Sequence, residues 1–228
     1  MAKSRLGIRT PEEADAEALA EDPLRDSFVW WDDVTMRHVA ALRRAVVRAK
    51  KEADMQGFLE RNPRLLVQHL GGGHGRWVVA QPRLGSQYVP DFVIGDEDST
   101  GRHWMAVELE GPQRPMFSRS GDPSRFLWHA IRQIIDWRVW LESNRDYAAR
   151  LPGDNGLGLE GISPSLPGLI VLGRRRLLDE RRKAFRRGLA RQLNIEIHTY
   201  DWLIERAEAR VASLEATKRA GNGDECEE

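Results

Sequence analysis

Short apolar strands alternate with helices near the end of the chain, and this alternation constrains the fold more than any other feature. Residues 169–172 (Leu-Ile-Val-Leu) are wholly apolar, and an arginine-rich segment over 178–193 has the composition of a helix. A second strand is predicted over 195–199, and a final helix over 200–214. A wholly apolar strand is typical of a parallel sheet that is buried on both faces. We therefore expect these two strands to pair in parallel, with helices covering the sheet.

Three further strands are predicted in the middle of the chain, over residues 77–81, 88–94 and 103–109. Glycine-rich segments at 85–86 and 95–101 supply the turns between them. Sequential strands with short connections favour an antiparallel meander. Combined with the parallel strands that follow, they predict an α/β fold with a central mixed sheet and helices on both faces.

Two long helices are predicted to flank the meander. The first begins at Val34 and continues to Leu59, with apolar residues three and four apart, and Asn62-Pro63 ends it. The second spans 124–144 and is apolar almost all round, which predicts a position deep in the core.

The 228 residues suit one domain with extensions. Residues 1–33 are acidic and lack a stable apolar stripe, so we expect a mobile arm there. The domain itself is predicted over 34–214, and a disordered acidic tail over 215–228. Cys226 is the sole cysteine, which excludes an intramolecular disulfide and a cysteine-based zinc site. With no apolar run of membrane-spanning length, a cytoplasmic location is expected and no membrane partner.

Positive charge is segregated although the net charge is zero. Arginines crowd residues 174–191, beginning with Arg174, Arg175 and Arg176. One interpretation is a solvated helix face. The other is a surface for a phosphate backbone, which requires clustered cations.

The residues best suited to chemistry are Asp91, Glu108 and Glu110. Side chains alternate along a strand, so the two glutamates share one face, and Asp91 begins the neighbouring strand. Three carboxylates at one sheet edge repel one another unless a cation neutralises them, and Mg²⁺ suits such oxygen ligands. The alternative is that Glu108 and Glu110 are outward residues of a half-exposed strand.

Gln133 interrupts the most apolar helix, and a buried amide requires hydrogen-bond partners. It either caps a backbone group in the core or faces the carboxylates and holds a water or a phosphate. The glycine-rich segment 71–75 lacks the ending of a phosphate-binding loop and is interpreted as a turn, and the histidines lack zinc-ligand spacing. We interpret the tryptophans, Trp128 among them, as core or interface residues.

Six segments in one order resemble the Shedu family of bacterial anti-phage proteins, whose shared domain is a PD-(D/E)XK-type nuclease. The matching segments are 58–63 (Phe-Leu-Glu-Arg-Asn-Pro), 89–92 (Val-Pro-Asp-Phe), 107–112 (Val-Glu-Leu-Glu-Gly-Pro), 130–137 (Ala-Ile-Arg-Gln-Ile-Ile-Asp-Trp), 170–175 (Ile-Val-Leu-Gly-Arg-Arg) and 199–203 (Thr-Tyr-Asp-Trp-Leu).

This resemblance implies metal-dependent cleavage of double-stranded DNA by a homo-oligomer. Asp91 and Glu108, with the carbonyl of Leu109, would hold Mg²⁺ or Mn²⁺, and Gln133 would match a glutamine of the following helix. The family usually has lysine at the position of Glu110. A glutamate there either acts as general base or second-metal ligand, or marks a domain that has lost cleavage. Arg114 is a candidate substitute cation, and Glu52 a further acid.

Three hypotheses follow. The first is a Mg²⁺-dependent DNA endonuclease in anti-phage defence, with Asp91, Glu108, Glu110 and Gln133 at the catalytic site and Arg174, Arg175 and Arg176 on the DNA backbone. The second is a catalytically inactive DNA-binding or sensor domain with the same fold. The third is a structural protein that uses its tryptophans for assembly.

Overall fold

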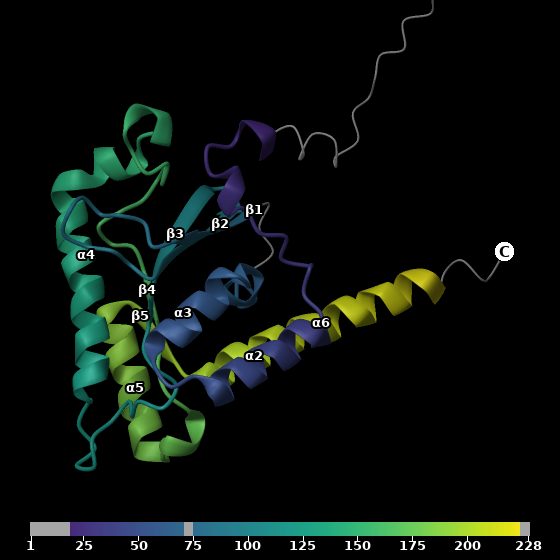
Figure 1. Cartoon of the computed structure of the whole chain (residues 1–228), viewed down its shortest axis with the longest axis vertical. Helices are drawn as coiled ribbons and strands as arrows, with labels where there is room; N and C mark the ends of the chain where they lie inside the picture. The colour runs from purple at the N-terminus through teal and green to yellow at the C-terminus, as the bar shows by residue number, and fades with distance from the viewer. Residues whose placement is uncertain (1–18, 71–74, 224–228) are drawn as a thin grey trace, which may run out of the picture.

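A five-stranded sheet in the order β1-β2-β3-β4-β5 organises the computed structural model, which describes residues 19–70 and 75–223 (Figure 1). β1 (Gly75–Ala80), β2 (Phe92–Asp98) and β3 (Gly101–Leu109) form an antiparallel meander. β4 (Gly168–Val171) and β5 (Ile195–His198) pair in parallel with β3 and with each other. The predicted mixed sheet is therefore confirmed.

Helices cover both faces of this sheet, as predicted (Figure 1). One face carries α4 (Arg125–Ala149) and α5 (Glu180–Leu193), and the other carries α2 (Met36–Arg48), α3 (Glu52–Glu60) and α6 (Tyr200–Gly223). The 3₁₀ turns η1 (Arg25–Ser27), η2 (Pro63–Leu66), η3 (Pro152–Asp154) and η4 (Arg175–Leu177) join these elements. Each face of the sheet packs against a hydrophobic core, and side chains that alternate along β3 contribute to both. Val107 and Leu109 belong to the core on the α2–α3–α6 side, and Ala106 to the core on the α4 side.

The single helix predicted over 34–59 is in fact two helices. α2 ends at Arg48, and Ala49 and Lys51 take non-helical backbone angles. The Oδ2 atom of Asp54 accepts hydrogen bonds from the backbone N–H groups of Lys50 (2.8 Å) and Lys51 (3.1 Å), which starts α3 anew. This break places Glu52 in the first turn of α3.

The second predicted strand is displaced along the chain. β2 begins only at Phe92 and continues through Gly95 to Asp98, so the turn predicted over 95–101 is reduced to the two residues between Asp98 and Gly101. The glycine at 95 serves packing instead, because a Cβ atom there would lie 2.6 Å from the ring of Trp104.

Replacing Gly95 with alanine should therefore destabilise the protein by about 1–3 kcal/mol, because the Trp104 ring must move to admit the methyl group. Gly153→Ala is the matched control, since a Cβ atom there meets nothing within 4 Å. Urea unfolding of both variants measures the difference. Equal midpoints for Gly95→Ala and wild type would contradict the packing account.

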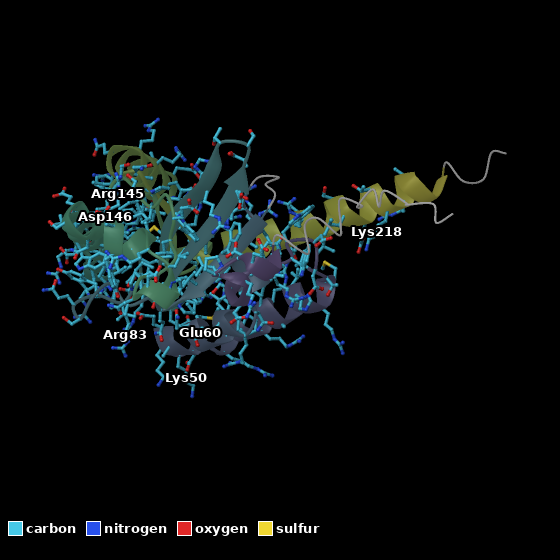
Figure 2. The ribbon with its side chains drawn as sticks, turned by 90° about the horizontal axis from the view of Figure 1, so that it is seen from above. Lys50, Glu60, Arg83, Arg145, Asp146 and Lys218 are labelled. Carbon is cyan, nitrogen blue, oxygen red and sulfur yellow. The ribbon has the colours of Figure 1, made fainter. Side chains whose placement is uncertain are left out.

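Both segments predicted as arms include residues that are folded. Leu24 and Val29 are buried, and the backbone N–H of Val29 donates to the carbonyl of Arg76 at 2.8 Å, so residues 19–33 include packed chain. Residues 1–18 and 224–228 lie outside the described part. The tail predicted from 215 is wrong over 215–223, where α6 continues past the body of the domain, and Lys218 marks this projecting part (Figure 2). No helix in the described part of the chain is long and apolar enough to cross a membrane.

The predicted deep burial of α4 holds for one side only. Ile131, Ile134 and Trp137 are buried, yet Trp128 and Val139 are more than half exposed and Ile135 is 39 % exposed. The helix also runs five residues beyond the predicted end, to Ala149. α4 therefore has an apolar face that no other described element covers.

Candidate active site

The site lies where β3 ends, beside the start of β2. Register pairs Phe92, the first residue of β2, with Val107, so Asp91, immediately before the strand, lies across from Glu108. The Oδ2 atom of Asp91 accepts a hydrogen bond from the backbone N–H of Leu109 at 2.8 Å. Burial raises the pKa of Asp91 to about 7, the Leu109 bond opposes this, and the nearby Glu52 and Glu60 add to it. The sequence thus correctly placed Asp91 next to the Glu-x-Glu strand.

Glu108 is the most buried acid of the site, at 3 % exposure. Burial raises its pKa well above the usual value, and the charges of Asp91, Glu52 and Glu110 raise it further. A hydrogen bond from the Gln133 side chain on α4 acts in the opposite direction. The Oε2 atom of Glu108 has no partner among the described residues. The alternative of outward-facing glutamates is therefore wrong, and Gln133 does face the carboxylates.

Glu110 shares the face of Glu108, as the strand alternation predicts, and it is only 6 % exposed. Burial raises its pKa to about 7, Glu52 and Asp91 raise it, and Arg114 lowers it. The Nδ1 atom of His129 on α4 lies 3.4 Å from its Oε1 atom. No sequence pattern connected His129 with this strand, because the contact spans two separate elements.

A pocket of about 610 Å³ opens beside Glu110. Its lining includes Glu52, Gly111, Arg114, Arg125 and His129. Partial burial raises the pKa of Glu52, while His129 and Arg114 lower it. Glu52 thus belongs to the site, and the break between α2 and α3 is what brings it there. Lys50, just before α3, and Glu60, its last residue, lie on the same side of the molecule as Arg83 (Figure 2).

The residues present fit a divalent ion held by two carboxylates better than by three. Among the described residues, no three His, Cys, Asp or Glu side chains are grouped closely enough to hold a metal ion. The predicted convergence of Asp91, Glu108 and Glu110 on one ion is therefore not found, and Glu110 lies against His129 instead. Asp91 with Glu108, whose Oε2 atom is buried and unpartnered, still suits Mg²⁺, which uses one or two carboxylates and retains waters.

The cations near the site are not those that the sequence singled out. Arg174 forms a two-pronged ion pair with Asp201, and Arg175 pairs with Glu205, so both are neutralised by α6. Arg176 is exposed. Ion pairing on α6 therefore weakens the prediction that Arg174 and Arg175 contact DNA, which stays a prediction.

Arg114 and Arg125 instead line the pocket and lie 4.7 and 4.8 Å from the ring centre of Phe126. Neither forms an ion pair in the described part of the chain. Arg114 therefore does turn towards the carboxylates. The sequence made it a candidate substitute cation but could not show this orientation.

Tyr200 was missed as a site residue by the sequence argument. It is the first residue of α6, fully buried, and its hydroxyl has no hydrogen-bond partner in the described part of the chain. Burial raises its pKa well above the usual value, and Asp91 is the largest charge adding to this. The available sequence signal for Tyr200 was its place in the segment 199–203, one of the six segments that resemble the Shedu family.

Comparison with protein families decides the relationship. Residues 49–204 match the family described as "Shedu protein SduA, C-terminal". The chain belongs to the Shedu family. The match contains Asp91, Glu108, Glu110 and Gln133, so the site just described is part of the Shedu domain. A search of curated proteins finds no match.

Among solved structures, the chain is similar to one titled "Structure of restriction endonuclease FokI bound to DNA". The TM-score is 0.44 at 16 % identity, and the alignment covers 96 % of this chain and 33 % of the FokI chain. This chain thus spans a third of that protein's length. The mixed five-stranded sheet with helices on both faces is consistent with the PD-(D/E)XK nuclease-like fold that the Shedu resemblance predicts.

Proposed function

We propose that this chain is a divalent-metal-dependent endonuclease that cleaves double-stranded DNA in anti-phage defence. The observation that carries the proposal is the buried carboxyl group of Glu108, whose Oε2 atom has no partner among the described residues and which lies beside Asp91. Burying such groups is costly unless a cation accompanies them. Mg²⁺ or Mn²⁺ is that cation in the proposal, held by Asp91 and Glu108, and the cytoplasm is where invading DNA is met.

A bound divalent ion would neutralise these carboxylates and polarise the phosphoryl oxygen of the substrate. Glu110 takes the role of general base in this proposal, because a pKa of about 7 allows it to accept a proton from water near neutral pH. His129, 3.4 Å away, orients the Glu110 carboxylate. Arg114 supplies the positive charge that the lysine of other Shedu proteins would bring. Gln133 holds Glu108 in place.

Calorimetric titration with Mn²⁺ tests the ion site. Wild type should bind the ion and release protons at pH 7, because Asp91 with a pKa of about 7 must lose its proton to become a ligand. The proton release is measured by repeating the titration in buffers of different ionisation heat. Asp91→Asn should show no uptake, whereas Asp26→Asn, an exposed aspartate in η1, should behave as wild type. Absence of heat with both Mn²⁺ and Mg²⁺ in wild type contradicts the proposal.

A catalytically inactive DNA-binding or sensor domain is the second candidate. The glutamate at position 110 favours it, as does the absence of a three-carboxylate group from the part of the chain that the structure describes. DNA binding that persists without any cleavage in Mg²⁺ or Mn²⁺ would select this candidate. Self-association stays a prediction in either case.

A further inference from the structure

The uncovered face of α4 forms a groove directly beside the candidate active site. Trp128, Ile131 and Ile135 provide its apolar surface, and Arg125, His129 and Arg132 provide its polar edge. The groove measures about 630 Å³, within the range of small-molecule binding sites. Arg125 and His129 also line the pocket at Glu110, so the groove adjoins the pocket.

An exposed tryptophan among cations needs an explanation. Trp128 is 51 % exposed, although Trp137 and Trp140 on the same helix are buried. Arg125 and Arg132 stand three residues before and four residues after it, so they lie above and below it on one helix face. Within the described residues, neither arginine forms an ion pair, in contrast to Arg174 and Arg175. Aromatic surface flanked by free guanidinium groups matches the chemistry of nucleotides.

We propose that this groove binds an unpaired nucleobase of the DNA substrate, stacked on Trp128, with Arg125 and Arg132 on the adjoining phosphates. Bases inside a duplex are covered by their neighbours, so a side chain can stack only on a base that is unpaired or flipped out. The substrate class is therefore DNA with a locally unpaired strand beside the phosphate to be cleaved. The inference rests on the proposed function, because it places the base beside the proposed site of cleavage. Binding in the groove does not itself require cleavage.

A second copy of the chain is the other occupant that the groove could take. The cations favour DNA, because two copies packed through this patch would bring the arginines near Trp128 towards each other, whereas a polyanion complements them. Val139, 58 % exposed, lies beyond the groove lining and is not needed by the nucleotide. Self-association is thus an outcome that the test must separate.

Fluorescence anisotropy in EDTA measures binding without cleavage, so failure of the proposed metal chemistry leaves this test intact. The probes are a labelled single strand, a duplex with a central unpaired bubble, and the fully paired duplex. Trp128→Ala should weaken binding of the first two by roughly 5- to 150-fold and leave the paired duplex unchanged. Trp128→Phe should recover part of the loss. Trp30→Ala is the matched control, because Trp30 is 57 % exposed and lies outside the groove.

Salt dependence separates stacking from charge. Arg132→Gln should reduce the slope of log K against log salt for the single strand by about 0.7, whereas Trp128→Ala should leave the slope unchanged. The inference is overturned if Trp128→Ala binds all three probes as wild type does, or if Trp30→Ala loses as much affinity. It is also overturned if sedimentation shows that Trp128→Ala dissociates an oligomer and DNA affinity falls equally for paired and unpaired probes.

Discussion

Plasmid cleavage by Asp91→Asn is expected to fall at least about 10³-fold below wild type in Mg²⁺ or Mn²⁺. Asp91 provides one of the two carboxylates proposed to hold the ion, and the amide of asparagine carries no charge. A loss of about 4 kcal/mol of transition-state stabilisation corresponds to this factor. The backbone of Leu109 can still donate to the remaining side-chain oxygen, so the strand pair should stay intact.

Gel analysis of supercoiled, nicked and linear plasmid measures the rate. Asp26→Asn serves as the control because its carboxylate is exposed and far from the strand pair in sequence. Wild type should lose activity in EDTA and regain it when the ion is restored. Cleavage by Asp91→Asn at even a tenth of the wild-type rate would remove Asp91 from the ion site.

Glu108→Gln is expected to stabilise the metal-free protein at pH 8 relative to the wild type. The folded-state pKa of Glu108 lies well above the usual 4.5, so the folded protein binds a proton that the unfolded chain has released. Stability of the wild type therefore falls as pH rises above about 4.5. Asp91 and Glu110, each with a pKa raised to about 7, contribute with the same sign.

Chemical unfolding in EDTA at pH 5 and pH 8 measures this effect. The gain from Glu108→Gln should be small at pH 5 and large at pH 8, because glutamine cannot ionise. Addition of Mn²⁺ should shift the difference towards the wild type by about 2.7 kcal/mol at a concentration of 100 times Kd, since only the wild type gains binding energy. Glu142→Gln, an exposed acid on α4, should change neither value. A less stable Glu108→Gln at pH 8 in EDTA would show that the carboxyl group is needed for the fold rather than for an ion.

Much of the architecture could be predicted because its signals are local. The apolar strand at 169–172 and the acids of β3 depend on alternation along single strands, which any extended chain imposes. Six short segments in one order, Asp91 and Glu108 among them, were enough to indicate the Shedu family that residues 49–204 match. Burial of Glu108 and Glu110 was not predicted, because it depends on their contacts with His129 and Gln133 of α4 on the face opposite Val107 and Leu109.

Errors arose where a local pattern has two structural outcomes. Gly95 resembles a turn glycine, yet it lies within β2 because the Trp104 ring occupies the space of its missing side chain. Helical periodicity likewise continues through Ala49, and only the hydrogen bonds of Asp54 show that a second helix begins there. For Gly95 the deciding contact is made by a side chain on the neighbouring strand. For the helix break it is made by a capping side chain, which hydrophobic periodicity does not encode.

The amino-acid order alone determined the strand and helix content, the face that Glu108 and Glu110 share, and the family. Only the tertiary structure decided which charges are paired: α6 neutralises Arg174 and Arg175, while Arg114 and Arg125, beside the pocket, form no ion pair with any described residue. It also decided that Trp128 is exposed and that Tyr200 and His129 belong with the carboxylates. Local patterning follows from backbone geometry, but a side chain's partners follow from how distant elements pack, and no segment specifies these by itself.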